Sequence, residues 1–170
     1  MFKNFLGSFA LASLLYIPPI FSDTLNATNQ YISQLKRSVS RLKDSHKETT
    51  KRLKNSSEKF IKVLLKADDK NIQKSKEILE NLIENYTEII ALTKYAIDEN
   101  ILPKKAKDVI YISLAMQDII RLRLSPVVWE SYKDYDFDDL IEYGKYLEKE
   151  KLRFTKYDEN SKEYECLFST

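Results

Sequence analysis

Hydrophobic residues recur with a seven-residue period between residues 28 and 67. When Ile32 is placed at heptad position a, eight of the eleven a and d positions are apolar. A 3.5-residue repeat sustained over about five heptads predicts one long helix with a narrow apolar seam. Three polar residues interrupt this seam near its middle and predict a looser contact there: His46, Thr49 and Ser56.

The same pattern continues over residues 71–99, after a polar stretch at residues 67–71. Asp68 or Asp69 is expected to cap the second helix, because a carboxylate accepts hydrogen bonds from the free N–H groups of a first turn. A connection this short predicts that the two helices form an antiparallel hairpin over residues 28–99. Positions a and d of the second helix are Ile72, Ser75, Leu79, Leu82, Tyr86, Ile89, Thr93 and Ala96.

A C-terminal helical layer is predicted over residues 103–154. Its first part, residues 103–124, carries apolar residues on nearly every side, which is typical of a helix buried all round. Pro103 suits the first turn of this helix, where a missing N–H group does no harm. We therefore expect residues 106–124 at the centre of this layer.

The pair Ser125-Pro126 is expected to end that helix and to begin a short one over residues 127–135. Asp136 is predicted to start the last helix, with Asp139 three residues later in an arrangement close to a capping box. Gly144 argues against one straight helix, because glycine is a poor helix former. The apolar side of the last helix consists of Phe137, Leu140, Ile141, Leu147 and Phe154.

Composition favours the same fold class. The chain has 170 residues, of which only two are glycine and four are proline, so few turn residues are available for a sheet of several strands. The sequence therefore predicts an all-α protein, a four- to five-helix bundle with a long N-terminal antiparallel helical hairpin. Residues 23–170 are expected to form a single helical domain that ends in a polar tail at residues 155–170.

An uncharged apolar run covers residues 5–21 near the amino terminus. A helix that crosses a bilayer needs roughly 20 apolar residues, and Pro18 and Pro19 shorten the usable helix further. We therefore expect residues 1–22 to be a secretory signal that is removed after Ser22, leaving an exported protein with no stable membrane span. An uncleaved short anchor and a buried first helix are the alternatives.

No catalytic, cofactor-binding or metal site is expected. His46 is the only histidine and Cys166 the only cysteine, whereas a zinc site needs three or four nitrogen, sulfur or carboxylate ligands. Neither residue lies in a recognisable hydrolase motif. Cys166 is the fifth residue from the end, so it misses the position that a prenylation motif requires.

Residues 134–145 resemble a calcium-binding loop only in part. Aspartates occupy the first, third and fifth positions, namely Asp134, Asp136 and Asp138. The sixth position is Asp139 instead of the glycine that the sharp turn requires, and the twelfth is Lys145 instead of a bidentate glutamate. Carboxylates that favour a helix N-terminus explain the cluster more simply.

Basic residues concentrate between Lys36 and Lys66, where eleven bases meet three acids. A polyanion or an anionic surface could therefore bind through residues 36–66. Nucleic acid is not expected as the ligand of an exported protein. The bases occupy positions around the predicted helix rather than one stripe, and acids elsewhere are expected to offset them: Glu77, Glu80, Glu84, Glu88 and those of residues 130–142.

Tyrosines crowd the last forty residues, and Trp129 lies just before them. Both residue types are enriched at protein interfaces, because one end of the side chain is apolar and the other forms hydrogen bonds. The alternative is a half-buried belt that closes the bundle. The tyrosines are Tyr132, Tyr135, Tyr143, Tyr146, Tyr157 and Tyr164.

These features predict an exported, non-enzymatic helical binding, adhesion or host-interaction protein at the cell surface, in the periplasm or in secretions, with a protein as partner. The alternative is a structural or chaperone-like helical protein that completes its heptad seam with a partner chain as an oligomer. Three N-x-S/T triplets, at Asn26, Asn55 and Asn85, would be glycan acceptors in a host that glycosylates.

Overall fold

The computed structural model describes residues 18–37, 42–137 and 139–157, apart from the side chains of Arg37, residues 42–46 and residues 151–157. Every described element is helical, which confirms the predicted all-α class for this part of the chain. The elements are α2 (Pro19–Arg37), α3 (Leu42–Lys66), α4 (Asp69–Lys74), α5 (Lys76–Asp98), the 3₁₀-helix η1 (Lys104–Ala106), α6 (Lys107–Leu124), α7 (Pro126–Tyr132) and α8 (Leu140–Tyr157).

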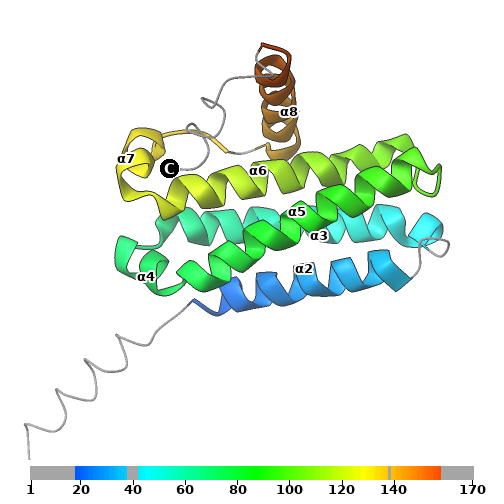
Figure 1. Cartoon of the computed structure of the whole chain (residues 1–170). Helices are drawn as coiled ribbons and strands as arrows, with labels where there is room; N and C mark the ends of the chain where they lie inside the picture. Colours follow the sequence, from blue (N-terminus) through cyan, green and yellow to red (C-terminus); the bar gives the residue numbers. More distant parts are fainter. Residues whose placement is uncertain (1–17, 38–41, 138, 158–170) are drawn as a thin grey trace, which may run out of the picture.

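Four long helices, α2, α3, α5 and α6, lie side by side, whereas α8 stands on α6 instead of lying along it (Figure 1). Helix α2 packs against α3 and α5, and α6 packs against the same two helices. Helices α7 and α8 also contact α6. Ten of the eighteen residues of α6 are buried, so the helix predicted to be the most buried one is the centre of the fold.

The predicted single helix over residues 28–67 is wrong. Helix α2 ends at Arg37 and α3 begins at Leu42, and the two helices pack against each other (Figure 1). The chain therefore reverses direction between them. A heptad pattern shows which residues face a core but not whether the helix continues, because two paired helices can share one period.

This reversal also changes the partner of α5. The predicted hairpin over residues 28–99 places α5 against the preceding long helix, but α5 packs mainly against α2 and α6. The eight heptad positions predicted for this segment are nevertheless all buried. Ser75 separates α4 from α5, and the Asp68 carboxylate accepts a 2.8 Å hydrogen bond from the Asn71 N–H, which confirms the predicted cap.

Helix α3 uses a slightly different face from the predicted one. Its d positions Thr49, Ser56 and Val63 are only half-buried, whereas Ser57 and Leu64, one residue later, are fully buried. An α-helix has 3.6 residues per turn, so its buried face drifts away from a strict 3.5-residue repeat. Thr49 and Ser56 therefore lie at the edge of the core.

The C-terminal layer agrees closely with the prediction from the sequence as far as the start of α8. Helix α7 spans Pro126–Tyr132, so the predicted short helix is present but ends three residues before the predicted residue 135. The last helix begins at Leu140 instead of Asp136, and the Asp139 carboxylate accepts hydrogen bonds from the N–H groups of Ile141 and Glu142. Phe137 is therefore buried just before the helix instead of within its first turn.

Gly144 lets α8 approach α6 closely. A Cβ atom at this position would lie 2.0 Å from the carbonyl oxygen of Tyr111 in α6 and 2.4 Å from its carbonyl carbon. Helix α8 continues through Gly144 to Tyr157, so this glycine does not interrupt it. The absence of a side chain is what allows the two backbones to touch.

Arg123 joins the ends of several elements. Its guanidinium is almost fully buried and donates hydrogen bonds to the carbonyl oxygens of Leu64 and Ala67, and to the carboxylate of Asp69 at 2.8 Å. The same guanidinium lies 5.2 Å from the ring centre of Trp129 in α7. Arg123 thus caps the C-terminal end of α3 and holds α4, α6 and α7 together.

The predicted leader lies largely outside the described residues, but its last residues do not. Phe21 in the first turn of α2 is fully buried, and its ring meets that of Phe60 edge to face at 5.3 Å. No helix in the described part of the chain has both the length and the apolar character needed to cross a membrane.

The core contains a buried phenol. Tyr86 of α5 and Ser57 of α3 place their hydroxyl groups together without a hydrogen bond of standard geometry. Burial raises the pKa of Tyr86 to about 12, and the Ser57 hydroxyl opposes this rise slightly. Tyr86 therefore stays protonated in the folded protein at a pH where the unfolded chain ionises.

Stability is expected to fall as the pH rises above about 10, because the unfolded state then binds fewer protons than the folded state. Tyr86→Phe should reduce this loss, whereas Tyr95→Phe, at an exposed position on α5, should leave it unchanged. Urea unfolding of the three proteins at neutral and alkaline pH measures the effect. Equal losses of unfolding free energy at alkaline pH in all three proteins would contradict the assignment of this effect to Tyr86.

Candidate functional site

Five aromatic side chains form a continuous cluster from the end of α7 to the second turn of α8. We call this cluster the aromatic surface. Neighbouring rings have centroids 5.5 to 6.5 Å apart, which is the range in which aromatic pairs attract each other. Its members are Tyr132, Tyr135, Phe137, Tyr143 and Tyr146.

Three members of the aromatic surface face solvent. Tyr132, Tyr135 and Tyr146 are 40%, 55% and 54% exposed, although each carries a large apolar ring. Phe137 is buried and Tyr143 is half-buried beneath them. Phe137 and Tyr143 therefore pack on the core, as the interpretation of a half-buried belt predicts, whereas use of the exposed tyrosines at an interface stays a prediction.

Tyr143 anchors the aromatic surface to α6. Its hydroxyl donates a hydrogen bond to the carboxylate of Asp118. Burial and then the negative charge of Asp118 raise the pKa of Tyr143 well above its usual range. The phenol therefore remains a hydrogen-bond donor, and together with Gly144 it fixes α8 on α6.

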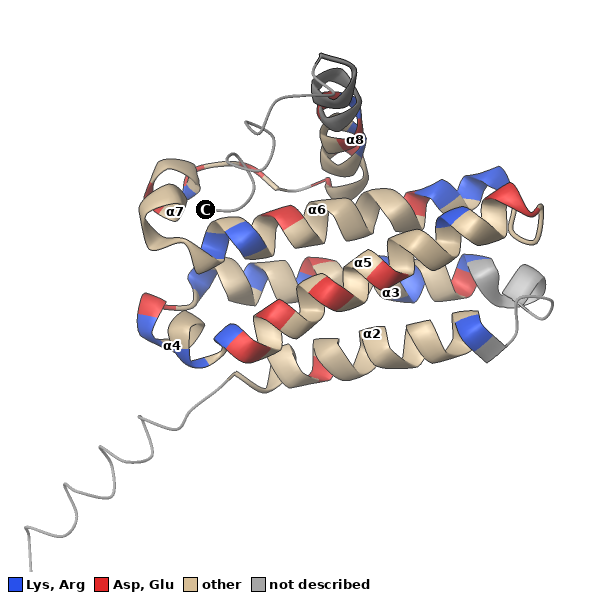
Figure 2. Cartoon of the chain, in the orientation of Figure 1, with Lys and Arg blue, Asp and Glu red and all other residues tan. Residues whose placement is uncertain are grey.

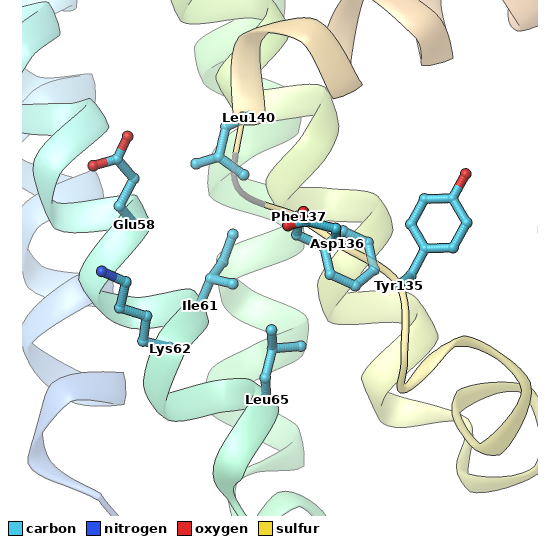
Figure 3. A pocket seen from close by; sticks show the side chains of 8 residues that line it. All are labelled: Glu58, Ile61, Lys62, Leu65, Tyr135, Asp136, Phe137 and Leu140. Atoms are coloured by element: carbon cyan, nitrogen blue, oxygen red, sulfur yellow. The ribbon is translucent and has the colours of Figure 1, made fainter.

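An apolar groove lies beside the aromatic surface, between α3 and the segment that precedes α8. We call it the α3–linker groove. Its volume is about 280 Å³. In Figure 3, Ile61 and Leu65 of α3 face Phe137 and Leu140, and the ring of Tyr135 points away from α3. Its remaining lining residues are polar, namely Glu58, Lys62 and Asp136.

The size of this groove limits what it can hold. Pockets for small molecules and cofactors usually measure about 300–1,000 Å³, so a groove of about 280 Å³ suits one or two side chains better than a cofactor. Its apolar floor also lacks a cluster of groups for acid–base or nucleophilic chemistry. The groove therefore has the features of an anchor pocket for a partner.

The two sides of the groove differ in charge, because the α3 side is lined by both Glu58 and Lys62 whereas the α8 side carries an excess of acids. On the α8 side, acidic side chains outnumber basic ones, and Lys133 and Lys145 are each paired with a neighbouring glutamate. On the α3 side, Lys62 lies at the rim. The acids on the α8 side are Glu130, Asp134, Asp136, Asp139 and Glu142.

Helix α3 presents a basic outer face. Its buried residues face α2 and α6, so the exposed lysines share the opposite side, which corrects the expectation that bases surround the helix. Two other bases are paired along the helix, Arg52 with Glu48 and Lys54 with Glu58. Five lysines form no ion pair with a described residue: Lys47, Lys51, Lys59, Lys62 and Lys66.

The acids of α5 do not offset these lysines. Helices α3 and α5 each pack against both α2 and α6, so they lie on different sides of the fold, and Figure 2 shows several acidic positions along α5. Glu88 pairs with Lys36 of α2, and Glu80 pairs with Lys76 in its own helix. The compensation expected from the acids of α5 therefore reaches α2 but not the described part of α3.

The described part of the chain does not bring the other candidate residues from the sequence together in a site. His46 lies in α3 with its side chain outside the described set, and Cys166 and Asp138 are also outside it. Within residues 18–36, 47–137 and 139–150, no group of three or more potential metal ligands is present. Trp129 is buried against Arg123 and does not join the aromatic surface.

The structure also locates part of the heptad seam and the three N-x-S/T triplets. Leu53 and Phe60 are buried between helices of the same chain, so this part of the seam is not open to a partner. The Asn85 amide donates hydrogen bonds to Thr28 and Asn29 on α2, both at 2.8 Å, which makes it a poor glycan acceptor after folding. Asn26 and Asn55 are exposed.

No protein-family model, curated protein or solved structure matches this chain. The identification of the aromatic surface and the α3–linker groove as a candidate site therefore depends only on the geometry of the described residues. Sequence analysis identified the tyrosines, but it missed the groove. The signal that could have revealed it is Phe137, a single apolar residue within the run of aspartates.

Proposed function

We propose that this protein is an exported, non-enzymatic binding module that contacts a protein partner through the aromatic surface and the α3–linker groove. In this proposal, α2, α3, α5 and α6 act as a rigid helical bundle that supports the site. The observation that carries it is the exposure of Tyr132, Tyr135 and Tyr146 beside an apolar groove. Binding energy at protein interfaces is concentrated in such aromatic anchors.

The partner is expected to offer an apolar or aromatic side chain next to a basic one. The apolar side chain would fill the groove between Ile61 and Phe137. The basic side chain would face the acidic α8 side, where Asp134 and Asp136 are exposed, rather than Lys62 on the α3 side. Opposite charges of this kind favour one orientation of the bound segment over the other.

Selection of peptides from a display library on the immobilised protein tests this proposal. Enriched peptides should share an apolar residue close to lysine or arginine. Tyr135→Ala should weaken their binding about tenfold or more, because truncation of a hot-spot residue costs about 2 kcal/mol or more and about 1.4 kcal/mol is tenfold in affinity. Isothermal titration calorimetry measures the affinities.

Tyr95→Ala is the matched control for Tyr135→Ala. Tyr95 is 60% exposed on α5, away from the groove, and forms no ring pair with a described residue. Its replacement should leave peptide affinity unchanged. Selected peptides that bind the Tyr135→Ala protein as tightly as the unaltered one would rule out this surface as the binding site.

A second candidate function is binding of a polyanion along α3. It is favoured by the five unpaired lysines on one face, which extend over about 28 Å from Lys47 to Lys66 at 1.5 Å per residue. A hollow of about 340 Å³ between α2 and α3 is lined by Lys59 of this face and by Arg52. Such an array attracts extended anions through charge rather than shape.

Retention on immobilised heparin at low salt measures this second candidate. A triple variant, Lys51→Glu, Lys59→Glu and Lys62→Glu, should elute at much lower salt than the unaltered protein, since exposed charges are screened by salt. A control with Lys94→Glu, Lys104→Glu and Lys105→Glu changes the net charge equally. Equal decreases in the eluting salt concentration for both variants would show that retention on heparin depends only on net charge.

A further inference from the structure

The segment that follows the predicted leader belongs to the folded core. Pro18 is buried, and its carbonyl oxygen accepts a 3.0 Å hydrogen bond from the N–H of Phe21. Phe21 is fully buried against Phe60, with ring centroids 5.3 Å apart. One turn later, the buried Thr24 hydroxyl donates a 2.7 Å hydrogen bond to the carbonyl of Ile20.

A cut after Ser22 would therefore damage the protein that it releases. It would remove Phe21 and leave the ring of Phe60 facing an empty space in the core. Removing a buried phenylalanine side chain is among the most destabilising changes that a core can undergo. The cut would also remove the first turn of α2, which begins at Pro19.

We infer that the mature protein keeps Pro18 and everything after it, and that the export cut lies upstream, within residues 1–17. This inference rests on the proposed export. In the cut, water hydrolyses one peptide bond, giving a carboxylate on the leader and an amine on the mature chain.

Amino-terminal sequencing and intact mass of the protein recovered from the exporting cell's exterior or periplasm test the inference. A first residue at or before Pro18 supports it. A mature chain that begins at Asp23 would overturn it. Recovery of the intact chain from the cytosol alone would count against export, but it would still show that Pro18–Ser22 is retained.

A stability measurement on the full chain separates this inference from export. Phe21→Ala should lower the thermal midpoint by roughly 5–15 °C, and Phe21→Leu by less. Val127→Ala, at a position of α7 that is 83% exposed, should leave the midpoint unchanged. If Phe21→Ala unfolds at the same temperature as the unaltered chain, Phe21 is not part of the core and the inference fails.

Discussion

Replacing Arg123 with methionine is expected to lower the free energy of unfolding by about 2–4 kcal/mol. Methionine keeps most of the buried volume but cannot donate hydrogen bonds. The carbonyl oxygen of Leu64 and that of Ala67 then lose their partner at the end of α3. A buried polar group left without a hydrogen bond costs about 1–3 kcal/mol.

The ion pair of Arg123 with Asp69 contributes little to this loss. The Asp69 side chain is 65% exposed, so water solvates its charge when the arginine is removed. The contact with the Trp129 ring adds a smaller share. The backbone carbonyl groups are therefore the main reason for the expected effect.

Urea unfolding followed by far-UV circular dichroism measures the Arg123→Met effect, and Arg121→Met is the matched control. Arg121 lies in the same last turn of α6 but is only half-buried. Since Trp129 is the only tryptophan, its fluorescence also reports whether α7 has moved. Equal stability of the two variants would contradict the capping role of Arg123.

Gly144→Ala is expected to destabilise the protein by about 1–3 kcal/mol, the usual cost of overpacking a filled core. Helix propensity alone predicts the opposite sign, a gain of about 1 kcal/mol for this change within a helix. The added Cβ atom would lie 2.0 Å from the Tyr111 carbonyl oxygen. Backbone atoms cannot rotate aside as a side chain can, so α8 must shift away from α6.

The sign of the change in unfolding free energy decides between the two effects at Gly144. Lys149→Ala, at an exposed position of α8, serves as the control and should change stability little. The shift of α8 should also weaken the hydrogen bond from Tyr143 to Asp118. A Gly144→Ala protein that is more stable than the unaltered one would show that α8 does not rest on the backbone of α6.

Sequence periodicity predicted which residues are buried better than it predicted how the helices connect. The positions from Ile72 to Ala96 were predicted individually and all are buried. The reversal between Arg37 and Leu42 was missed, because the heptad register runs through that point without an obvious turn signal. Only the pairing of α2 with α3 in space reveals it.

The candidate site was predictable only in part. The concentration of tyrosines after Trp129 is visible in the sequence. Which of them are exposed depends on where α8 crosses α6, and that crossing depends on Gly144 and on the distant Asp118. The groove itself combines residues of α3 with Phe137, about seventy positions later, so the local pattern can mark Phe137 but not the α3 residues that it faces.

Backbone-amide NMR of the protein with a display-selected peptide tests the central claim, that the aromatic surface and the α3–linker groove are a binding site. We expect the largest shift changes at residues 58–65 and 132–146, with those of α5 nearly unaffected. Shift changes concentrated on α5, around Glu84 and Tyr95, with residues 132–146 unchanged, would contradict the account.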